Sequence, residues 1–226
     1  MVSLNLYTSL ILSIVVQVVT LGIDITSLFI HVPTAFLFLK QMLWLEVMVQ
    51  FVEGIFYVYW LYNFNTISNI TPRRYYDWAF TTPTVLITLI FFLNFLKHKE
   101  DNTSDTLNFF ELFHQEFNTI VTVLLLNWLM LLFGYLGENN VIPVLLGVGL
   151  GFIPFLMYYY IIYKKYAVLT NNGLKIFAYS FIVWALYGIV AVLPYKMKNM
   201  CYNILDLFSK NFFGIFLSYL IFVNRY

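Results

Sequence analysis

A lysine near the middle of the last apolar stretch offers the chain's most reactive group. Lys210 follows Asp206 by four residues, and the rest of the stretch from 200 to 224 carries no charge. On a helix, residues four apart share one face, so the carboxylate can neutralise the ammonium group. A desolvated amine is also easily deprotonated and can condense with an aldehyde. These two residues fit a plain ion pair inside a membrane and a covalent attachment point equally well.

Two further acids lie in the apolar segment from 36 to 61. Glu46 and Glu53 are seven residues apart, which on a helix places them on one side, two turns from each other. A charged side chain inside a bilayer costs roughly 3 kcal/mol or more, so such residues face the protein interior or water. The pair fits protonated structural acids as well as a hydrated ion path, which is the interpretation that we favour.

The third apolar segment opens with a charged pair. Arg74 and Asp77 are three residues apart and are therefore neighbours on a helix. Pro83 removes one backbone hydrogen bond further along, and threonine hydroxyls beside it can bond the freed carbonyl group.

The composition indicates an integral membrane protein. Of 226 residues, 62% are hydrophobic and only 10% are charged, whereas soluble domains carry about 25% charged residues. A net charge of +1 argues against a nucleic-acid partner, and one cysteine excludes an intrachain disulfide and a cysteine-based metal site. The three histidines lack metal-ligand spacing, and neither a nucleophile–base pattern nor a phosphate loop is present. We therefore expect no metal and no enzymatic function.

Seven segments are long enough to cross a bilayer, which takes about 20 apolar residues. They are 5–30, 36–61, 74–96, 109–136, 141–163, 173–194 and 200–224. Because the connections are short, we predict one all-α domain over residues 1–226, a multi-pass bundle of seven transmembrane helices. Lysine and arginine are more frequent in the connections on the side of the C-terminus, which predicts an outside N-terminus and a cytoplasmic C-terminus.

Together these motifs resemble the microbial, retinal-binding rhodopsins. The resemblance is carried by residues 74–78 (RYYDW) with 81–83 (TTP), by the pair Trp184 and Tyr187, and by residues 206–210 (DLFSK). It extends over the whole chain.

The resemblance implies roles for the charged residues. Lys210 would hold all-trans retinal as a protonated Schiff base, with Asp77 and Asp206 as counter-ions. Arg74 would lie on their outer side and keep both carboxyl groups ionised, and Tyr187 would bond Asp206.

It also implies the walls of the retinal site. Trp78 and Trp184 would enclose the polyene from two sides. Thr82 would face a polar residue of the fourth span, for which Asn127 is a candidate.

Pumps of this family carry a second carboxyl group in the third helix, eleven residues after the counter-ion. That position holds Thr88 here, and the connection 194–199 contains no acid. Without a proton donor on the inner side, reprotonation should be slow.

The acids of the second helix instead resemble those of channelrhodopsins, which are light-gated cation channels. There an asparagine follows the lysine, as Asn211 does here, and a serine of the first helix and a glutamate of the second complete a constriction. Depth along the helices assigns these roles to Ser13, with Ser9 as a rival, and to Glu46, with Glu53 further out.

The compact chain looks most like the rhodopsins of giant viruses of algae. We therefore predict a light-gated cation channel, with a slow light-driven proton pump and a sensory photoreceptor as alternatives. Its expected partners are membrane lipid, retinal and the translocated cations or protons. The aromatic outer faces suit a homo-oligomer and lipid contact equally well.

Overall fold

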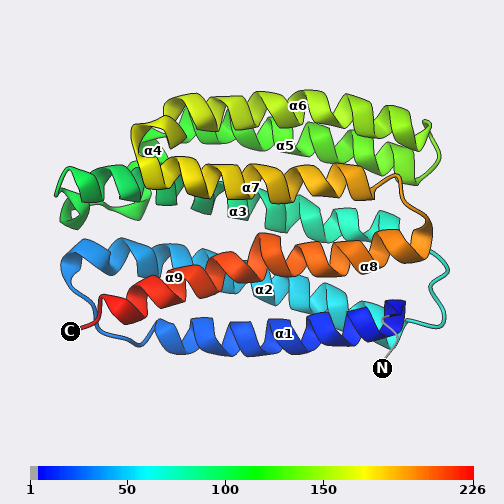
Figure 1. The fold of residues 1–226 in the computed structure, drawn as a ribbon, viewed down its shortest axis with the longest axis horizontal. Helices are drawn as coiled ribbons and strands as arrows, with labels where there is room; N and C mark the ends of the chain where they lie inside the picture. Colours follow the sequence, from blue (N-terminus) through cyan, green and yellow to red (C-terminus); the bar gives the residue numbers. More distant parts are fainter. Residues whose placement is uncertain (1–4) are drawn as a thin grey trace.

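The computed structural model describes residues 5–226, which form an all-helical bundle (Figure 1). Within these residues seven helices or helix runs are long and apolar enough to cross a membrane, which confirms the predicted fold. They are α1 (Leu6–Ser27), η1 (Thr34–Phe36) with α2 (Leu37–Tyr62), α3 (Thr71–Glu100), α5 (Phe117–Glu138), α6 (Val144–Lys165) with η3 (Ala167–Leu169), α7 (Asn171–Val190), and α8 (Tyr195–Asp206) with η4 (Leu207–Asn211) and α9 (Phe212–Val223). Helix α1 begins and helix α9 ends at opposite ends of the bundle.

The predicted fourth span is divided into two helices. The connection after α3 contains the short helix η2 (Ser104–Thr106) and leads into α4 (Phe109–Gln115), and Glu116 separates α4 from α5. Glu116 has a non-helical backbone (φ −94°, ψ 5°). Its carboxyl group accepts hydrogen bonds from Lys165 and Tyr166, both at 2.5 Å, and thereby ties this corner to the end of α6.

The last span is interrupted near its middle by the π-helical turn η4. Such turns are rare and occur frequently at functional sites. Lys210 lies within this turn. The irregular backbone thus occurs at the lysine whose amine the sequence predicts to be reactive.

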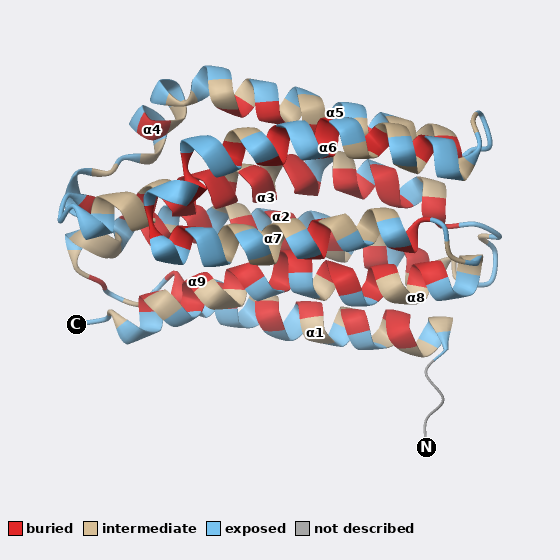
Figure 2. Cartoon of the chain, turned by 45° about the horizontal axis from the view of Figure 1, so that its top comes forward, coloured by how far each residue is buried: buried red, intermediate tan, exposed pale blue. Residues whose placement is uncertain are grey.

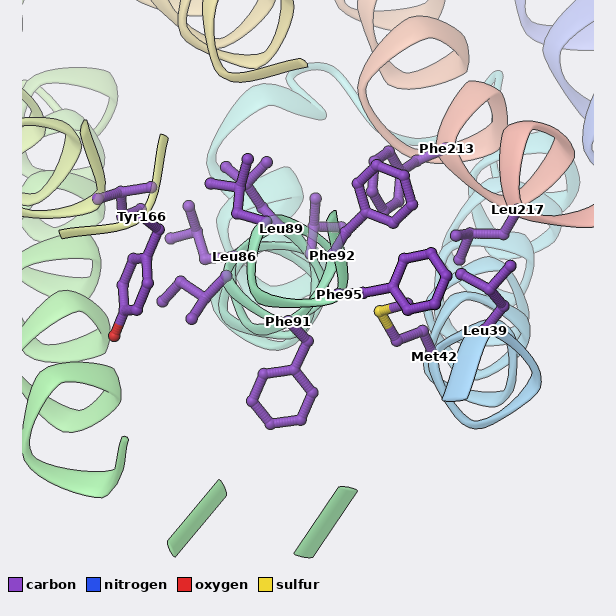
Figure 3. Close-up of a cluster of buried hydrophobic side chains, with 14 of the residues drawn as sticks. Leu39, Met42, Leu86, Leu89, Phe91, Phe92, Phe95, Tyr166, Phe213 and Leu217 are labelled. Atoms are coloured by element: carbon purple, nitrogen blue, oxygen red, sulfur yellow. The ribbon is translucent and has the colours of Figure 1, made fainter. Parts of the chain in front are cut away.

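The side of the bundle around α3 is closely packed and apolar. Figure 3 shows this cluster, in which Phe92 and Phe95 of α3 lie near Met42 of α2 and near Phe213 and Leu217 of α9. The rings of Phe92 and Phe213 meet edge to face, with centroids 5.7 Å apart. Because lipid tails are as apolar as these side chains, close van der Waals contact holds the helices together here.

The inward side of α1 is polar. Its buried residues are almost all hydroxyl, amide or carboxyl side chains, and from position 10 onward they alternate at spacings of three and four: Ser9, Leu10, Ser13, Gln17, Thr20, Asp24 and Ser27. In Figure 2 the buried positions appear as repeated red bands along α1, which packs against α8 and α9. The apolar residues of α1 point outward, and Val18 is 66% exposed. α1 is thus oriented with its polar side toward the protein and its apolar side toward lipid.

Candidate functional site

Lys210 is fully buried among three carboxyl groups that come from three different spans. Its Nζ donates to Asp77 Oδ2 at 2.8 Å, and it lies 3.5 Å from Glu53 Oε1 and 3.6 Å from Asp206 Oδ1. Asp77 belongs to α3, Glu53 to α2 and Asp206 to α8. The structure thus brings together the predicted amine and both predicted acids. It also places Glu53, which the sequence assigns to an ion path further out, directly beside the lysine.

Arg74 binds Asp206 on the side away from Lys210. Its Nη1 lies 3.2 Å from Asp206 Oδ2, and its Nε donates to Asn199 Oδ1 at 2.9 Å. Asp206 also accepts hydrogen bonds at 2.7 Å from Tyr57 and from Tyr187, the second of which the sequence predicts. Buried charges are tolerated where they are paired and hydrogen-bonded, so this network fixes Asp206 between two cations.

A cavity lined by aromatic rings and glycines lies next to this cluster. Trp78, Trp184 and Tyr187 all line it, and the Tyr187 ring contacts both tryptophans, with centroids 5.4 and 5.5 Å away. A Cβ atom added to Gly188 would lie 2.6 Å from the ring of Phe152, so the space depends on this glycine. Further lining residues are Tyr75, Thr82, Met130, Leu131, Gly134, Gly147, Val148, Gly151, Phe155, Ala191 and Tyr202. Rings on two sides and bare backbone on others suit a flat apolar group.

The backbone of α3 at Pro83 is supported by the neighbouring α5. Pro83 lacks the N–H that would bond the Ala79 carbonyl, and this carbonyl accepts instead from Trp128 Nε1 at 2.9 Å. Asn127, the predicted partner in the fourth span, donates to Thr82 Oγ1 at 2.7 Å. Two side chains of α5 therefore fix the wall of the cavity at the proline.

The structure does not bring Ser13, Glu46 and Asn211 together at one constriction. Ser13 donates to the Asn203 carbonyl at 3.1 Å, and Asn211 Nδ2 donates to Thr20 Oγ1 at 2.8 Å. Asn203 and Asn211 are eight residues apart, about 12 Å along a helix. Both oxygens of Glu46 are buried without a hydrogen bond to any described residue. Ser9, the rival of Ser13, accepts from Asn203 Nδ2 at 2.9 Å.

Sequence reasoning missed a second group of buried polar residues between α1, α2 and α9. Thr20 Oγ1 lies 3.4 Å from Gln50 Oε1, and Gln50 Nε2 donates to Asp24 at 2.5 Å. Asp24 also accepts from Ser218 at 2.6 Å. The signal is present in the sequence, since Gln17, Thr20 and Asp24 repeat at the spacing of one helix face.

Solved structures similar to this chain are rhodopsins by their names. The viral rhodopsin OLPVRII is 28% identical with a TM-score of 0.79, and the match covers 95% of this chain and 96% of that one. The blue light-absorbing proteorhodopsin from Med12 is 20% identical (TM-score 0.72, 96% of each chain covered). The bromide-bound halorhodopsin from Halobacterium salinarum is 14% identical (TM-score 0.71, 97% and 94% covered), and these two similarities show the fold. No curated protein sequence matches the chain.

The sequence pattern of the bacteriorhodopsin-like protein family matches residues 7–224, nearly the whole chain. Proteins of this family bind retinal through a Schiff base to a lysine. The seven apolar helices agree with this match. The chain therefore belongs to the bacteriorhodopsin-like family of integral, multi-pass membrane proteins.

Proposed function

We propose that this protein is a light-gated cation channel that carries all-trans retinal on Lys210. The observation that carries the proposal is a row of buried polar residues between α1, α2 and the last span. This polar seam consists of Ser9, Ser13, Gln17, Thr20, Asp24, Gln50, Glu53, Asn203, Asn211 and Ser218. Apolar side chains would pack these helices at lower cost in a bilayer, whereas ions and water need polar groups along their path.

The residues around Lys210 suit the retinal of this family. Lys210 supplies the amine, Asp77 and Asp206 balance its positive charge, and Trp78 and Trp184 line the apolar cavity. Retinal supplies the absorption of visible light and a change of shape on illumination. The structure contributes a fixed set of charges and a cavity that depends on Gly188 for its space.

The polar seam and the retinal site share residues, which supports gating by light. Glu53 lies 3.5 Å from Lys210 and belongs to the seam. Asn211, the residue after Lys210, is bonded to Thr20 of α1. A displacement of Lys210 would therefore act directly on the contacts that close the path between the helices.

One observation favours the second candidate, a slow proton pump. Thr88 occupies the position where pumps of the family carry a carboxyl group, and the Glu46 carboxyl of α2 lies beside it. An acid from another helix thus reaches the place of the missing donor. This arrangement would serve proton uptake as well as cation passage.

Patch-clamp recording of the retinal-loaded protein under light separates these functions. A channel gives photocurrents that change sign when the voltage crosses the reversal potential, whereas a pump current keeps one direction. Glu46→Gln should alter the conductance of a channel and should abolish the sustained current of a pump. Photocurrents of one direction would refute the channel, and the absence of any current would favour a sensory photoreceptor. Lys210→Ala is the control without pigment.

The isomer and the source are separate parts of the proposal. Retinal extracted from the dark protein and analysed by chromatography should be all-trans, and another dominant isomer would refute that part. The 28% identity with a viral rhodopsin supports a viral origin. The aromatic outer faces suit self-association, which the mass of the detergent-solubilised protein would test.

A further inference from the structure

Asp24 joins three helices near the C-terminal end of the bundle. Its side chain is completely buried in α1. Asp24 Oδ2 accepts from Gln50 Nε2 of α2 at 2.5 Å, and Asp24 Oδ1 accepts from Ser218 Oγ of α9 at 2.6 Å. Each carboxyl oxygen is thus held by a donor from a different helix. These two hydrogen bonds connect the three spans that form the polar seam.

The carboxyl group of Asp24 lies against bare backbone of α9. A Cβ atom added to Gly214 would overlap Asp24 Oδ2 and would lie 2.5 Å from Gln50 Nε2. Any other residue at this position would push the carboxyl group out of its place. The close approach of α1 and α9 therefore depends on a glycine, as is usual where helices of a membrane protein meet closely.

Among residues 5–226, Asp24 has no ion pair with a lysine, arginine or histidine. Gln17, further along the same face of α1, is also buried, and its side-chain nitrogen and oxygen form no hydrogen bond with the described residues. Polar groups without partners are expensive in a bilayer. The inward face of α1 thus carries a carboxyl group without a paired cation and an amide oxygen without a hydrogen bond, and both could bind a cation.

The polar seam ends at Asp24. Between it and the C-terminal end of the bundle, α1, α2 and α9 contribute buried apolar residues beside Ser27 of α1. These are Leu28, Leu39, Leu43, Leu217 and Ile221. On the other side of Asp24 the seam continues through Gln50 and Thr20 to Asn211. Asp24 is therefore the acid of the polar seam that lies nearest to this apolar region.

We propose that Asp24 forms the inner constriction of the conduction path and binds the passing cation there. In this closed structure, Gln50 and Ser218 occupy both oxygens of the carboxyl group. In the conducting state, water separates these donors from the carboxyl group, which then faces a monovalent cation or a hydronium ion. The inference rests on the proposed channel function and adds the residue that selects the ion on the inner side.

The test compares Asp24→Asn with Asp105→Asn, which makes the same change at an exposed site in the connection after α3. Photocurrents are normalised to the visible absorbance of the retinal-loaded protein. Differences in the amount of correctly folded protein therefore do not affect the comparison. Asp24→Asn should lower the current about tenfold, because a carboxylate in contact with a cation is removed. It should also shift the reversal potential in a sodium gradient, which a purely structural residue would not do. Asp105→Asn should change neither quantity.

Ser218→Ala provides a second test that retains the carboxyl group. Loss of the hydrogen bond from Ser218 to Asp24 should slow channel closing after light-off about fivefold. The reversal potential should stay unchanged. Normal current and reversal potential in Asp24→Asn would overturn the inference and leave the channel function standing. Currents of one direction in the unsubstituted protein would overturn both. If Asp24→Asn binds no retinal, unchanged closing in Ser218→Ala overturns the inference.

Discussion

Asp77→Asn should move the visible absorption of the retinal-loaded protein to longer wavelength, and by more than Glu53→Gln does. The Lys210 nitrogen lies 2.8 Å from Asp77 and 3.5 Å from Glu53. The positive charge at this nitrogen is largest in the dark state, and excitation moves part of it away. Loss of a nearby anion therefore raises the ground state more than the excited state and narrows the gap between them.

The two distances give the relative size of the effect. At an effective dielectric constant of about 20, the Coulomb attraction is about 6 kcal/mol for Asp77 and about 5 kcal/mol for Glu53. The red shift is a fraction of these energies, and it should be about one quarter larger for Asp77→Asn. The shift for Asp77→Asn should exceed that for Glu53→Gln whether Glu53 is ionised or protonated. If Glu53 is protonated, its replacement by glutamine removes no charge and leaves the spectrum almost unmoved. Asp206 is less suited to the comparison, because its removal also frees Arg74.

The assay is the absorption spectrum of each purified variant in the dark, at one pH and one salt concentration. Lys210→Ala should show no visible absorption band, which would confirm that the band comes from this site. Asp105→Asn, which removes an exposed charge, should leave the wavelength of the band unchanged. A larger shift for Glu53→Gln would show that the charged nitrogen faces α2 instead of α3. An unmoved spectrum for Asp77→Asn would leave Asp206 or Glu53 as the counter-ion and refute the reasoning.

Two further predictions concern the walls of the cavity. Gly188→Ala should lower the yield of pigment at saturating retinal, because the added Cβ lies 2.6 Å from the ring of Phe152; a normal yield would show that the ring moves aside easily. Trp128→Phe should reduce thermal stability, measured as loss of visible absorbance on heating, by about 1–3 kcal/mol, because the Ala79 carbonyl loses its donor. The cost should shrink in a Pro83→Ala background, where the restored backbone N–H can bond that carbonyl, and an equal cost in both backgrounds would contradict this role.

The seven spans could be predicted from the sequence because each is long, apolar and bounded by polar residues. The cluster of Lys210, Asp77 and Asp206 could be predicted because its motifs are local. Residues three or four apart on one helix hold nearly fixed positions relative to each other. The resemblance then supplied the relation between helices that spacing alone does not contain.

The depth of the second-helix acids could not be predicted, because the apolar pattern does not mark the start of the last span. Its apolar stretch begins near residue 200, but the helix begins at Tyr195. Residues 195–199 include two lysines and one asparagine and therefore fall outside a search for apolar residues. It folds as helix because Lys198 pairs with Glu138 at 2.7 Å and Asn199 bonds Arg74. Asn211 is thus sixteen residues from the helix start instead of eleven from the predicted one.

The role of the polar residues of α1 could not be predicted for a different reason. Each hydroxyl or amide can satisfy itself by bonding its own helix, as Thr20 does with the Gln17 carbonyl. Taken singly, such residues are uninformative in a membrane helix. Their meaning emerges from the facing surface, where Gln50 and Ser218 complete the contacts of Asp24.

The last span joins two unlike halves of the bundle within three consecutive residues. Ser209 lies 2.7 Å from the hydroxyl of Tyr187, which lines the aromatic cavity, while Asn211 bonds Thr20 in the polar seam. Lys210 lies between them and contacts the acids. In the π-helical turn that holds these residues, the backbone hydrogen bonds are longer-ranged and less regular than in an α-helix. A small rotation of this turn would thus change the contacts of the cavity and of the seam together, so coupling between light absorption and conduction needs no long pathway through the protein.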